Sequence, residues 1–164
     1  MPLTIRPVST EDRAALGRLA GELVRLFHRM DPDRFIPGEG VDEGYGAWLL
    51  KEASAELGRV FVAIDGGNLI GYVFVRREPR NWMELLDEHG KVHDLMVREG
   101  TRRRGVGRLL MEHAMGALRE MGCERIVLST AAVNETAQKF FASLGFRPTM
   151  VEMTLTDSTQ RAAQ

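Results

Sequence analysis

The most regular pattern in the chain lies between residues 106 and 121, where apolar residues recur at steps of three and four. These positions are Val106, Leu109, Leu110, Ala114, Ala117, Leu118 and Met121. Because an α-helix has about 3.6 residues per turn, this spacing places them on one face and the charged residues on the other. The same criteria and the capping residues predict three more helices: from Ser9 or Thr10 to about Met30, over residues 45–57, and from a cap at Asn134 to Leu144.

Shorter apolar or alternating runs predict strands between these helices. The predicted strands cover residues 4–8, 59–64, 69–76, 91–97 and 124–130, followed by a final strand marked by Val151, Met153 and Leu155. The sequence Asp65-Gly66-Gly67-Asn68 is typical of a tight turn and predicts an antiparallel hairpin around it. The pattern therefore predicts strands and helices that alternate along most of the chain.

Two connections, residues 31–46 and 77–90, are rich in acidic residues. Surface loops are commonly polar, so a solvated loop is one interpretation. The other is that both line a site for a cationic molecule, with Phe35, Tyr45 and Trp82 as its apolar part. The second connection is equally compatible with a short helix around WMELLDEHG.

Length and composition predict one globular domain over residues 1–156 and a polar tail over 157–164. The net charge of −1 argues against a nucleic-acid partner held by bulk electrostatics. The single cysteine, Cys123, excludes an internal disulfide and is interpreted as a buried spectator, and no metal-ligand spacing is present. No signal peptide or membrane-spanning run is found, so a cytoplasmic protein is expected.

A basic, glycine-containing turn joins the strand at 91–97 to the helix that begins near Val106. Gly105 and Gly107 allow backbone N–H groups at the helix start to approach an anion closely, where the helix dipole favours negative charge. The surrounding arginines suit phosphate oxygens. The Walker loop is absent, and the dinucleotide fingerprint fails because Leu110 stands where its third glycine belongs. The turn is therefore predicted to bind a pyrophosphate of another kind.

Two motifs in this order resemble those of the GNAT superfamily of N-acetyltransferases. Arg102-Arg103-Arg104-Gly105-Val106-Gly107 matches the acyl-coenzyme A loop R-x-x-G-x-G, and Asn134, Ala137, Phe140 and Gly145-Phe146 match N-x-x-A-x-x-F-Y-x-x-x-G-F. The resemblance covers nearly the whole chain. It implies an α/β (α+β) fold with a central mixed, mostly antiparallel sheet of six to seven strands, helices on both faces, and two splayed parallel strands that bind acyl-coenzyme A.

The resemblance also implies acetyl-coenzyme A as co-substrate, with no metal, and assigns residues to it. These are Leu95, Met96, Val97, Arg102, Arg103, Arg104, Gly105, Val106, Gly107, Arg108, Asn134, Ala137, Phe140 and Phe141. The backbone of the strand residues would hold the pantetheine arm, with the Met96 N–H as an oxyanion donor. Phe141 stands where the family often has a tyrosine that protonates the departing thiolate, and a phenyl ring cannot donate a proton.

The implied reaction is acetyl transfer to a primary amine by direct attack in a ternary complex, which needs a base because most amines are protonated at neutral pH. His93 stands where several relatives carry a glutamate that acts through water, and Asp94 is its neighbour. Side chains alternate along a strand, so without a bulge the two face opposite sides. His93 is the preferred base, with Asp94 behind it.

Three points stay open at this stage. The acceptor is a small-molecule or peptide amine, and the acid-rich connections favour a cation. A non-catalytic acyl-coenzyme A binding module or sensor is the alternative function, and Phe141 is the residue that favours it. A homodimer is conceivable through the final strand around Met150, Val151 and Met153.

Overall fold

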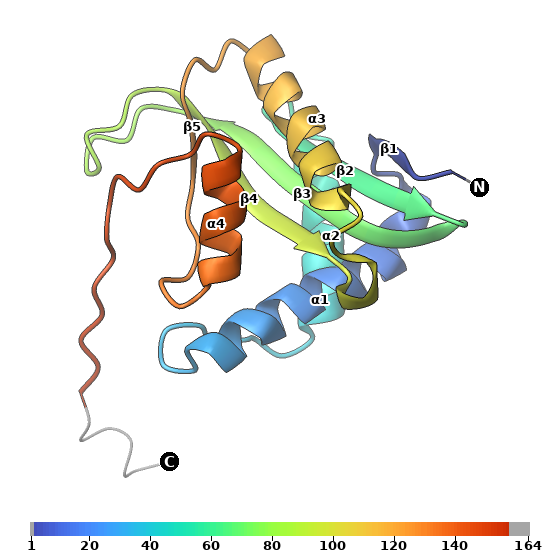
Figure 1. The fold of residues 1–164 in the computed structure, drawn as a ribbon, viewed down its shortest axis with the longest axis horizontal. Coiled ribbons are helices and arrows are strands. Elements are labelled where there is room, and N and C mark those ends of the chain that lie inside the picture. The colour runs from blue at the N-terminus through green and yellow to red at the C-terminus, as the bar shows by residue number, and fades with distance from the viewer. Residues whose placement is uncertain (1, 158–164) are drawn as a thin grey trace. The chain divides into compact units, whose positions relative to one another are not determined.

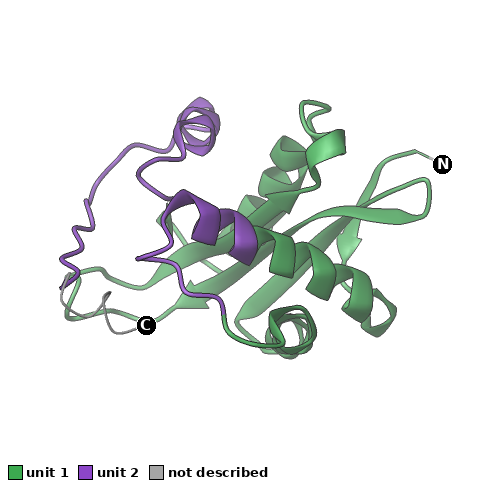
Figure 2. Cartoon of the chain, turned by 90° about the horizontal axis from the view of Figure 1, so that it is seen from below, with its two compact units in different colours: residues 1–23, 38–129 green, residues 24–37, 130–164 purple. Residues whose placement is uncertain are grey.

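The computed structural model describes residues 2–157, and the chain divides into two compact units. Unit 1 combines residues up to 23 with residues 38–129, and unit 2 combines residues 24–37 with those from 130 onward (Figure 2). In chain order the elements are β1 (Thr4–Pro7), the 3₁₀ helix η1 (Thr10–Asp12), α1 (Arg13–Met30), α2 (Val41–Ala53), β2 (Gly58–Asp65), β3 (Asn68–Glu78), β4 (His89–Val97), η2 (Glu99–Thr101), α3 (Val106–Glu120), β5 (Ile126–Leu128) and α4 (Glu135–Ser143) (Figure 1). The single domain expected over residues 1–156 stays a prediction.

The sheet of unit 1 has the order β1-β2-β3-β4-β5. The pairs β1–β2, β2–β3 and β3–β4 are antiparallel, whereas β4 and β5 run parallel. This mixed sheet with helices confirms the predicted fold class. The expected six to seven strands are wrong by count, because five strands form within residues 2–157.

The missing element is the final strand, which the alternation of Val151, Met153 and Leu155 predicted. Residues 147–157 form neither helix nor strand, and these three side chains are almost fully exposed. A strand needs a neighbouring strand for its backbone hydrogen bonds and a surface that buries one of its faces. An alternating pattern by itself supplies neither, so the prediction was wrong for this segment.

Helix α3 lies on one face of the sheet and α2 on the other (Figure 1). On the α3 face, Leu110 and Leu118 reach glycines of the sheet: a Cβ at Gly71 would lie 3.1 Å from Leu110 Cδ1, and one at Gly90 2.8 Å from Leu118 Cδ1. The predicted apolar face of α3 is confirmed at its buried positions, which are Val106, Leu110, Ala114 and Leu118. Burial of this face against the sheet is the main source of stability for such a helix.

Helices α1 and α2 cross in unit 1 at two glycines. A Cβ at Gly17 would lie 2.2 Å from the Asp42 carbonyl oxygen, and one at Gly46 would lie 2.9 Å from Gly17 Cα. Both neighbours are backbone atoms, which cannot move aside as a side-chain tip can. The close crossing therefore depends on the absence of side chains at both positions.

Gly17→Ala is expected to lower the free energy of unfolding by about 1–3 kcal/mol, because the added methyl group forces the two backbones apart. The matched control is Gly44→Ala, also a helical glycine, where a Cβ would meet nothing within 4 Å. That change should be neutral or stabilising by up to about 1 kcal/mol through helix propensity. Thermal unfolding measures both, and equal melting temperatures for the two variants would contradict the crossing argument.

Three features differ from the sequence expectations. The second helix runs from Val41 to Ala53, and Gly58 begins β2 instead of ending the helix. The backbone at Gly58 passes close to Glu52, so that a Cβ there would lie 2.2 Å from the Glu52 carbonyl oxygen. The connection at 77–90 is not a helix, because Asn81 and Leu86 exchange backbone hydrogen bonds that extend the β3–β4 hairpin. Strand β5 is only half-buried.

Unit 2 contains the second sequence motif and residues 31–37 of the first acidic connection, whose remaining residues belong to unit 1. The side-chain oxygen of Asn134 accepts a hydrogen bond from the Ala137 N–H at 3.1 Å, and Gly145 takes a φ of +95° just beyond α4, so the predicted cap and stop are confirmed. Phe35 packs against Phe27 with ring centroids 4.9 Å apart. Among the residues that the structure describes, no helix is both long and apolar enough to cross a membrane.

Candidate functional site

A β-bulge in β4 reorients the two candidate bases. In the β3–β4 ladder, Phe74 pairs with Asp94 and Val75 pairs with Val92, so His93 is the extra residue. Asp94 contacts Tyr72 and the His93 ring stacks on Phe74, two residues that share one face of β3. The prediction that His93 and Asp94 face opposite sides was conditional on a regular strand. Because the bulge is present, both side chains contact the α2 face of the sheet.

Asp94 is held by two phenols. Its Oδ2 accepts hydrogen bonds from the Tyr45 hydroxyl at 2.7 Å and the Tyr72 hydroxyl at 3.0 Å, and the residue is 9% exposed. Burial raises the pKa of Asp94, and the two donated bonds oppose part of that shift. Burial also raises the pKa of Tyr45 and Tyr72, with the neighbouring carboxylate adding to it. This arrangement joins α2, β3 and β4 through one buried carboxylate.

His93 is partly exposed and has a carboxylate partner. Its Nε2 lies 2.7 Å from Glu78 Oε1, and its ring stacks on Phe74 at a centroid distance of 5.0 Å and an angle of 20°. Within residues 2–157 the structure gives His93 Nδ1 no hydrogen-bond partner. His93 thus combines a partly exposed side chain with a ring nitrogen that has no partner among the described residues, whereas Asp94 is buried.

An aromatic row leads from Tyr45 to His93. The Tyr45 and Trp48 rings are stacked at 5.3 Å, and Trp48 meets Phe74 edge-on at 5.3 Å. Phe74 then stacks on His93. Trp48 is 40% exposed, so the row, defined as Tyr45, Trp48, Phe74 and His93, presents an apolar surface beside the candidate base.

The three residues predicted to bind substrate lie in different surroundings. Tyr45 contacts Asp94 within unit 1. Trp82 lies 72% exposed in the β3–β4 connection, with the Arg80 guanidinium 4.2 Å above its ring. Phe35 belongs to unit 2. Of the two that lie in unit 1, Tyr45 belongs to the cluster around Asp94, whereas Trp82 contacts Arg80.

Tyr72, Glu78 and Trp48 were missed from the sequence. All three belong to apolar or amphipathic segments in which a side chain of this kind is ordinary. One signal was present for Glu78: it follows Phe74 and Arg76 at two-residue steps and so shares their face of the strand. The bulge was not predicted, so no sequence pattern placed His93 on that face of the sheet.

Within residues 2–157, the C-terminal half of β4 pairs with a strand on one side only. Strand β5 pairs with β4 only at Gly90, Lys91 and Val92, so the parallel ladder ends before the bulge. Leu95, Met96 and Val97 still pair with β3 on the other side. Backbone groups of these three residues on the side away from β3 have no strand partner in the described part of the chain.

The basic loop follows directly from this strand. The Arg102 Nε donates to the Val97 carbonyl at 3.0 Å, and Arg104 Nη1 lies 2.7 Å from Asp65 Oδ2. Arg103 and Gly105 both have positive φ, +66° and +77°. These contacts shape a turn between the end of β4 and the start of α3.

The start of α3 has the features of an anion site. The N–H of Leu109 donates to the Gly105 carbonyl, so the N–H groups of Val106 and Gly107 precede the first bond of the helix. A Cβ at Gly105 would meet nothing within 4 Å, which means that open space adjoins this backbone. A 15-residue helix whose N-terminus faces open space beside several arginines is suited to phosphate.

The second motif supplies aromatic rings in unit 2. The Phe140 and Phe141 ring centroids are 5.3 Å apart, and Phe141 meets the Phe146 ring at 6.0 Å. Both Phe140 and Phe141 are half-buried. The oxygen of Asn134 accepts the capping bond of α4, and its amide group also has two N–H donors.

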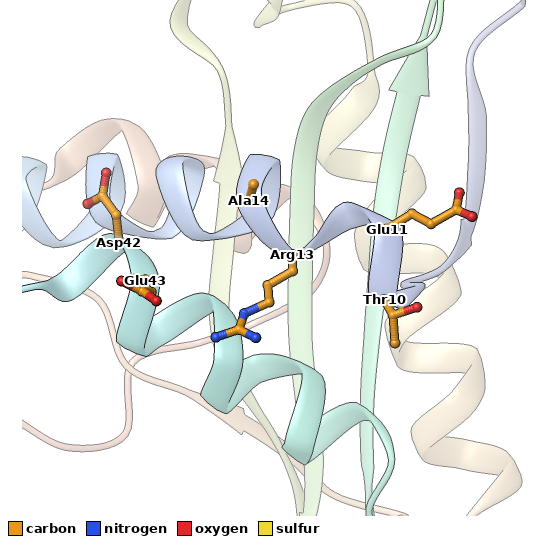
Figure 3. A pocket seen from close by; sticks show the side chains of 6 residues that line it. All are labelled: Thr10, Glu11, Arg13, Ala14, Asp42 and Glu43. Carbon is orange, nitrogen blue, oxygen red and sulfur yellow. The ribbon is translucent and has the colours of Figure 1, made fainter.

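Two of the pockets lined by described residues of unit 1 bear on the location of the site. The larger, about 500 Å³, lies at the starts of α1 and α2, and Figure 3 shows Arg13 extending toward α2, which carries Asp42 and Glu43. The smaller, about 320 Å³, is lined by Glu78, Pro79, Arg80, Asn81, Glu84, His89 and Lys91. Only the smaller one includes a residue bonded to a candidate base, namely Glu78. Of these two pockets, the smaller is thus the one linked to His93, through Glu78.

Cys123 does not provide a nucleophile. It is buried, and burial raises the pKa of its thiol. Since the thiolate is the reactive form, this environment disfavours a covalent route. The prediction of a buried cysteine is confirmed.

Comparison with known proteins identifies relatives of the chain. The sequence model of the acetyltransferase (GNAT) family matches residues 23–146. Streptothricin acetyltransferase of Streptomyces lavendulae is 30% identical over 114 residues, which are 69% of this chain and 56% of that protein. N-alpha-acetyltransferase 30 of Schizosaccharomyces pombe is 29% identical over 86 residues, or 52% of this chain and 55% of that protein. The chain thus spans about half the length of these curated relatives.

Solved structures show the same fold. A tetramutant of the BH1408 protein from Bacillus halodurans has a TM-score of 0.79 at 23% identity, covering 93% of this chain and 99% of that chain. The aminoglycoside N-acetyltransferase AAC(6')-Iy in complex with CoA has a TM-score of 0.73 at 18% identity, covering 96% and 95%. The family match spans both the basic loop and the asparagine motif. This chain therefore belongs to the acetyltransferase (GNAT) family.

Proposed function

We propose that this protein is an N-acetyltransferase that transfers the acetyl group of acetyl-coenzyme A to a primary amine by direct attack in a ternary complex. One observation carries the proposal. Strand β4 presents the partly exposed His93 at its bulge and leads, at its C-terminal end, into the basic loop that opens on the α3 N-terminus. A base and an anion site on consecutive segments are what a reaction between an amine and a coenzyme A thioester needs.

The residues present fit coenzyme A. The open space at Gly105 and the N–H groups of Val106 and Gly107 suit its pyrophosphate, with Arg102, Arg103, Arg104 and Arg108 supplying positive charge. The unpaired edge of β4 after Val92 supports a pantetheine arm along Leu95 and Val97. The Met96 N–H is then the proposed donor to the thioester oxygen. The proposed coenzyme contacts of Asn134, Ala137, Phe140 and Phe141 rest on their sequence motif alone.

The proposed chemistry begins with the acceptor. A primary ammonium group gives one proton to His93 Nδ1, which frees the nitrogen lone pair. The amine nitrogen then bonds to the thioester carbonyl carbon while the C–S bond breaks and its electron pair leaves on sulfur. The nitrogen loses a second proton as the amide forms, and the thiolate takes up one, so that amide, thiol and one net proton result. Phe141 has no proton to give, and water is the proposed carrier to the thiolate.

The acceptor is proposed to be a cationic amine on a small molecule or a peptide. Glu78 lies beside His93, and the Trp48 ring contacts Phe74, which stacks on His93. A carboxylate and the face of an indole ring both attract ammonium groups. The names of the two relatives support one class each: streptothricin acetyltransferase supports a small-molecule acceptor, and N-alpha-acetyltransferase 30 supports a peptide acceptor. Trp82 and Phe35 are retained as proposed contacts of a larger acceptor.

Thiol release from acetyl-coenzyme A tests the function across aminoglycosides, polyamines, amino acids and basic peptides. The proposal expects release that depends on one class of amine and that matches the amide formed. The alternative, a non-catalytic acyl-coenzyme A module, is favoured by Phe141 alone. It predicts saturable acetyl-coenzyme A binding with no amine-dependent thiol release from any class.

We also propose a homodimer in which the segment around Met150, Val151 and Met153 contacts a second copy. These side chains are 74–89% exposed, and contiguous exposed apolar side chains mark contact surfaces. Light scattering should give twice the mass of one chain, and Val151→Lys with Met153→Lys should halve it. A single-chain mass for the unaltered protein at micromolar concentration would contradict the proposal.

A further inference from the structure

Glu78 reaches His93 across the bulge. In the β3–β4 ladder its partner is His89, four residues before His93, yet its carboxylate bonds to the His93 ring. The two side chains are 23% and 28% exposed, so the contact is partly shielded from water. A charge-assisted hydrogen bond of 2.7 Å in such a place is stronger than one on the open surface.

This bond determines which ring nitrogen carries the proton. A neutral imidazole has one N–H donor and one acceptor nitrogen, and a carboxylate can only accept. Nε2 must therefore carry the hydrogen when it contacts Glu78, which leaves the lone pair on Nδ1. The stacking on Phe74 restricts the tilt of the same ring. Together the two contacts present Nδ1 as the basic atom.

Glu78 also forms an ion pair with Arg76. Arg76 Nε lies 3.8 Å from Glu78 Oε2, and Arg76 also bonds to Glu52 of α2. Asp94, the next residue on the same strand, also interacts electrostatically with His93. One oxygen of Glu78 thus faces Arg76 while the other faces His93.

We propose that Glu78 is a positioning residue for His93: it holds Nε2–H, so that Nδ1 receives the proton of the acceptor ammonium, and its negative charge stabilises the imidazolium that results. The inference rests on the proposed function, in which His93 is the base. It assigns to Glu78 a role in proton removal that is separate from coenzyme binding.

Kinetics of three variants test the assignment. Glu78→Ala is expected to lower kcat by about 10- to 100-fold, as for other residues that orient a functional histidine, with the Kd for acetyl-coenzyme A unchanged. Glu78→Gln keeps an acceptor oxygen but removes the negative charge, so kcat should fall here as well, again with the Kd for acetyl-coenzyme A unchanged. Glu78→Asp should recover part of the loss. The matched control is Glu112→Gln on the exposed face of α3, which should leave rate and profile unchanged.

Nitrogen NMR of the His93 ring gives a readout that needs no turnover. The unaltered protein should show the tautomer with hydrogen on Nε2, and Glu78→Gln should show a mixture. A ring with hydrogen on Nδ1 in the unaltered protein would overturn the positioning role.

The two proposals fail in different ways. If His93→Ala removes the ionisation but Glu78→Gln leaves kcat as it was, the role of Glu78 is wrong and that of His93 stands. If His93→Ala leaves the profile unchanged, the base assignment is wrong, and with it the inference about Glu78.

Discussion

His93→Ala is expected to lower kcat/KM for the acceptor amine by about 10²- to 10⁴-fold, the usual contribution of a positioned general base. In the unaltered protein the rate should rise with pH through one ionisation, because only the neutral imidazole accepts a proton. That ionisation should be absent from the variant, in which the remaining rate depends on the small fraction of neutral amine. Steady-state rates between about pH 5 and 9 make the comparison, a range that spans imidazole titration.

The control is His113→Ala. This histidine lies exposed on α3, where its Nδ1 contacts the Leu109 carbonyl at 2.9 Å. It should change neither the rate nor the pH profile. An ionisation that persists in His93→Ala would assign proton removal to Asp94 or to water.

Gly105→Val is expected to raise the Kd for acetyl-coenzyme A by about 10- to 100-fold, which corresponds to about 1.4–2.8 kcal/mol. Gly105 has a φ of +77°, a conformation that costs a β-branched residue of order 1–2 kcal/mol. The branched side chain would also fill the open space next to the Val106 and Gly107 N–H groups. Isothermal titration of the cofactor measures the change, with thermal unfolding recorded alongside.

Gly116→Val is the matched control for this variant. Gly116 lies in the middle of the same helix, and a Cβ there would meet nothing within 4 Å. It should leave the cofactor Kd unchanged. Equal affinity for the unaltered protein and Gly105→Val would contradict the location of the pyrophosphate at the α3 N-terminus.

Local signals in the sequence predicted much of this fold. The three and four residue spacing from Val106 to Leu118 predicted α3, and the hairpin around Gly66-Gly67 was predicted from turn chemistry. Asn134 and Gly145 marked the ends of α4 to within a residue. These features depend on a few neighbouring residues, which is why the sequence is informative about them.

Features that depend on pairing between distant segments could not be predicted. The bulge at His93 results from the register of β3 against β4, and no residue type at that position requires it. The pairing of Glu78 with His93 and the enclosure of Asp94 by two tyrosines follow from that register. At residues 151–155 the sequence predicted a strand that the structure lacks: the alternating pattern is present, but the segment pairs with no described strand.

The most direct test of the central claim is the mass of each candidate amine after incubation with acetyl-coenzyme A and the purified protein. The account predicts one acceptor class that gains a single acetyl group on nitrogen, with one thiol released per amide and a rate that falls sharply in His93→Ala. Saturable cofactor binding with no acetylated amine, or thiol release by hydrolysis alone, would contradict it.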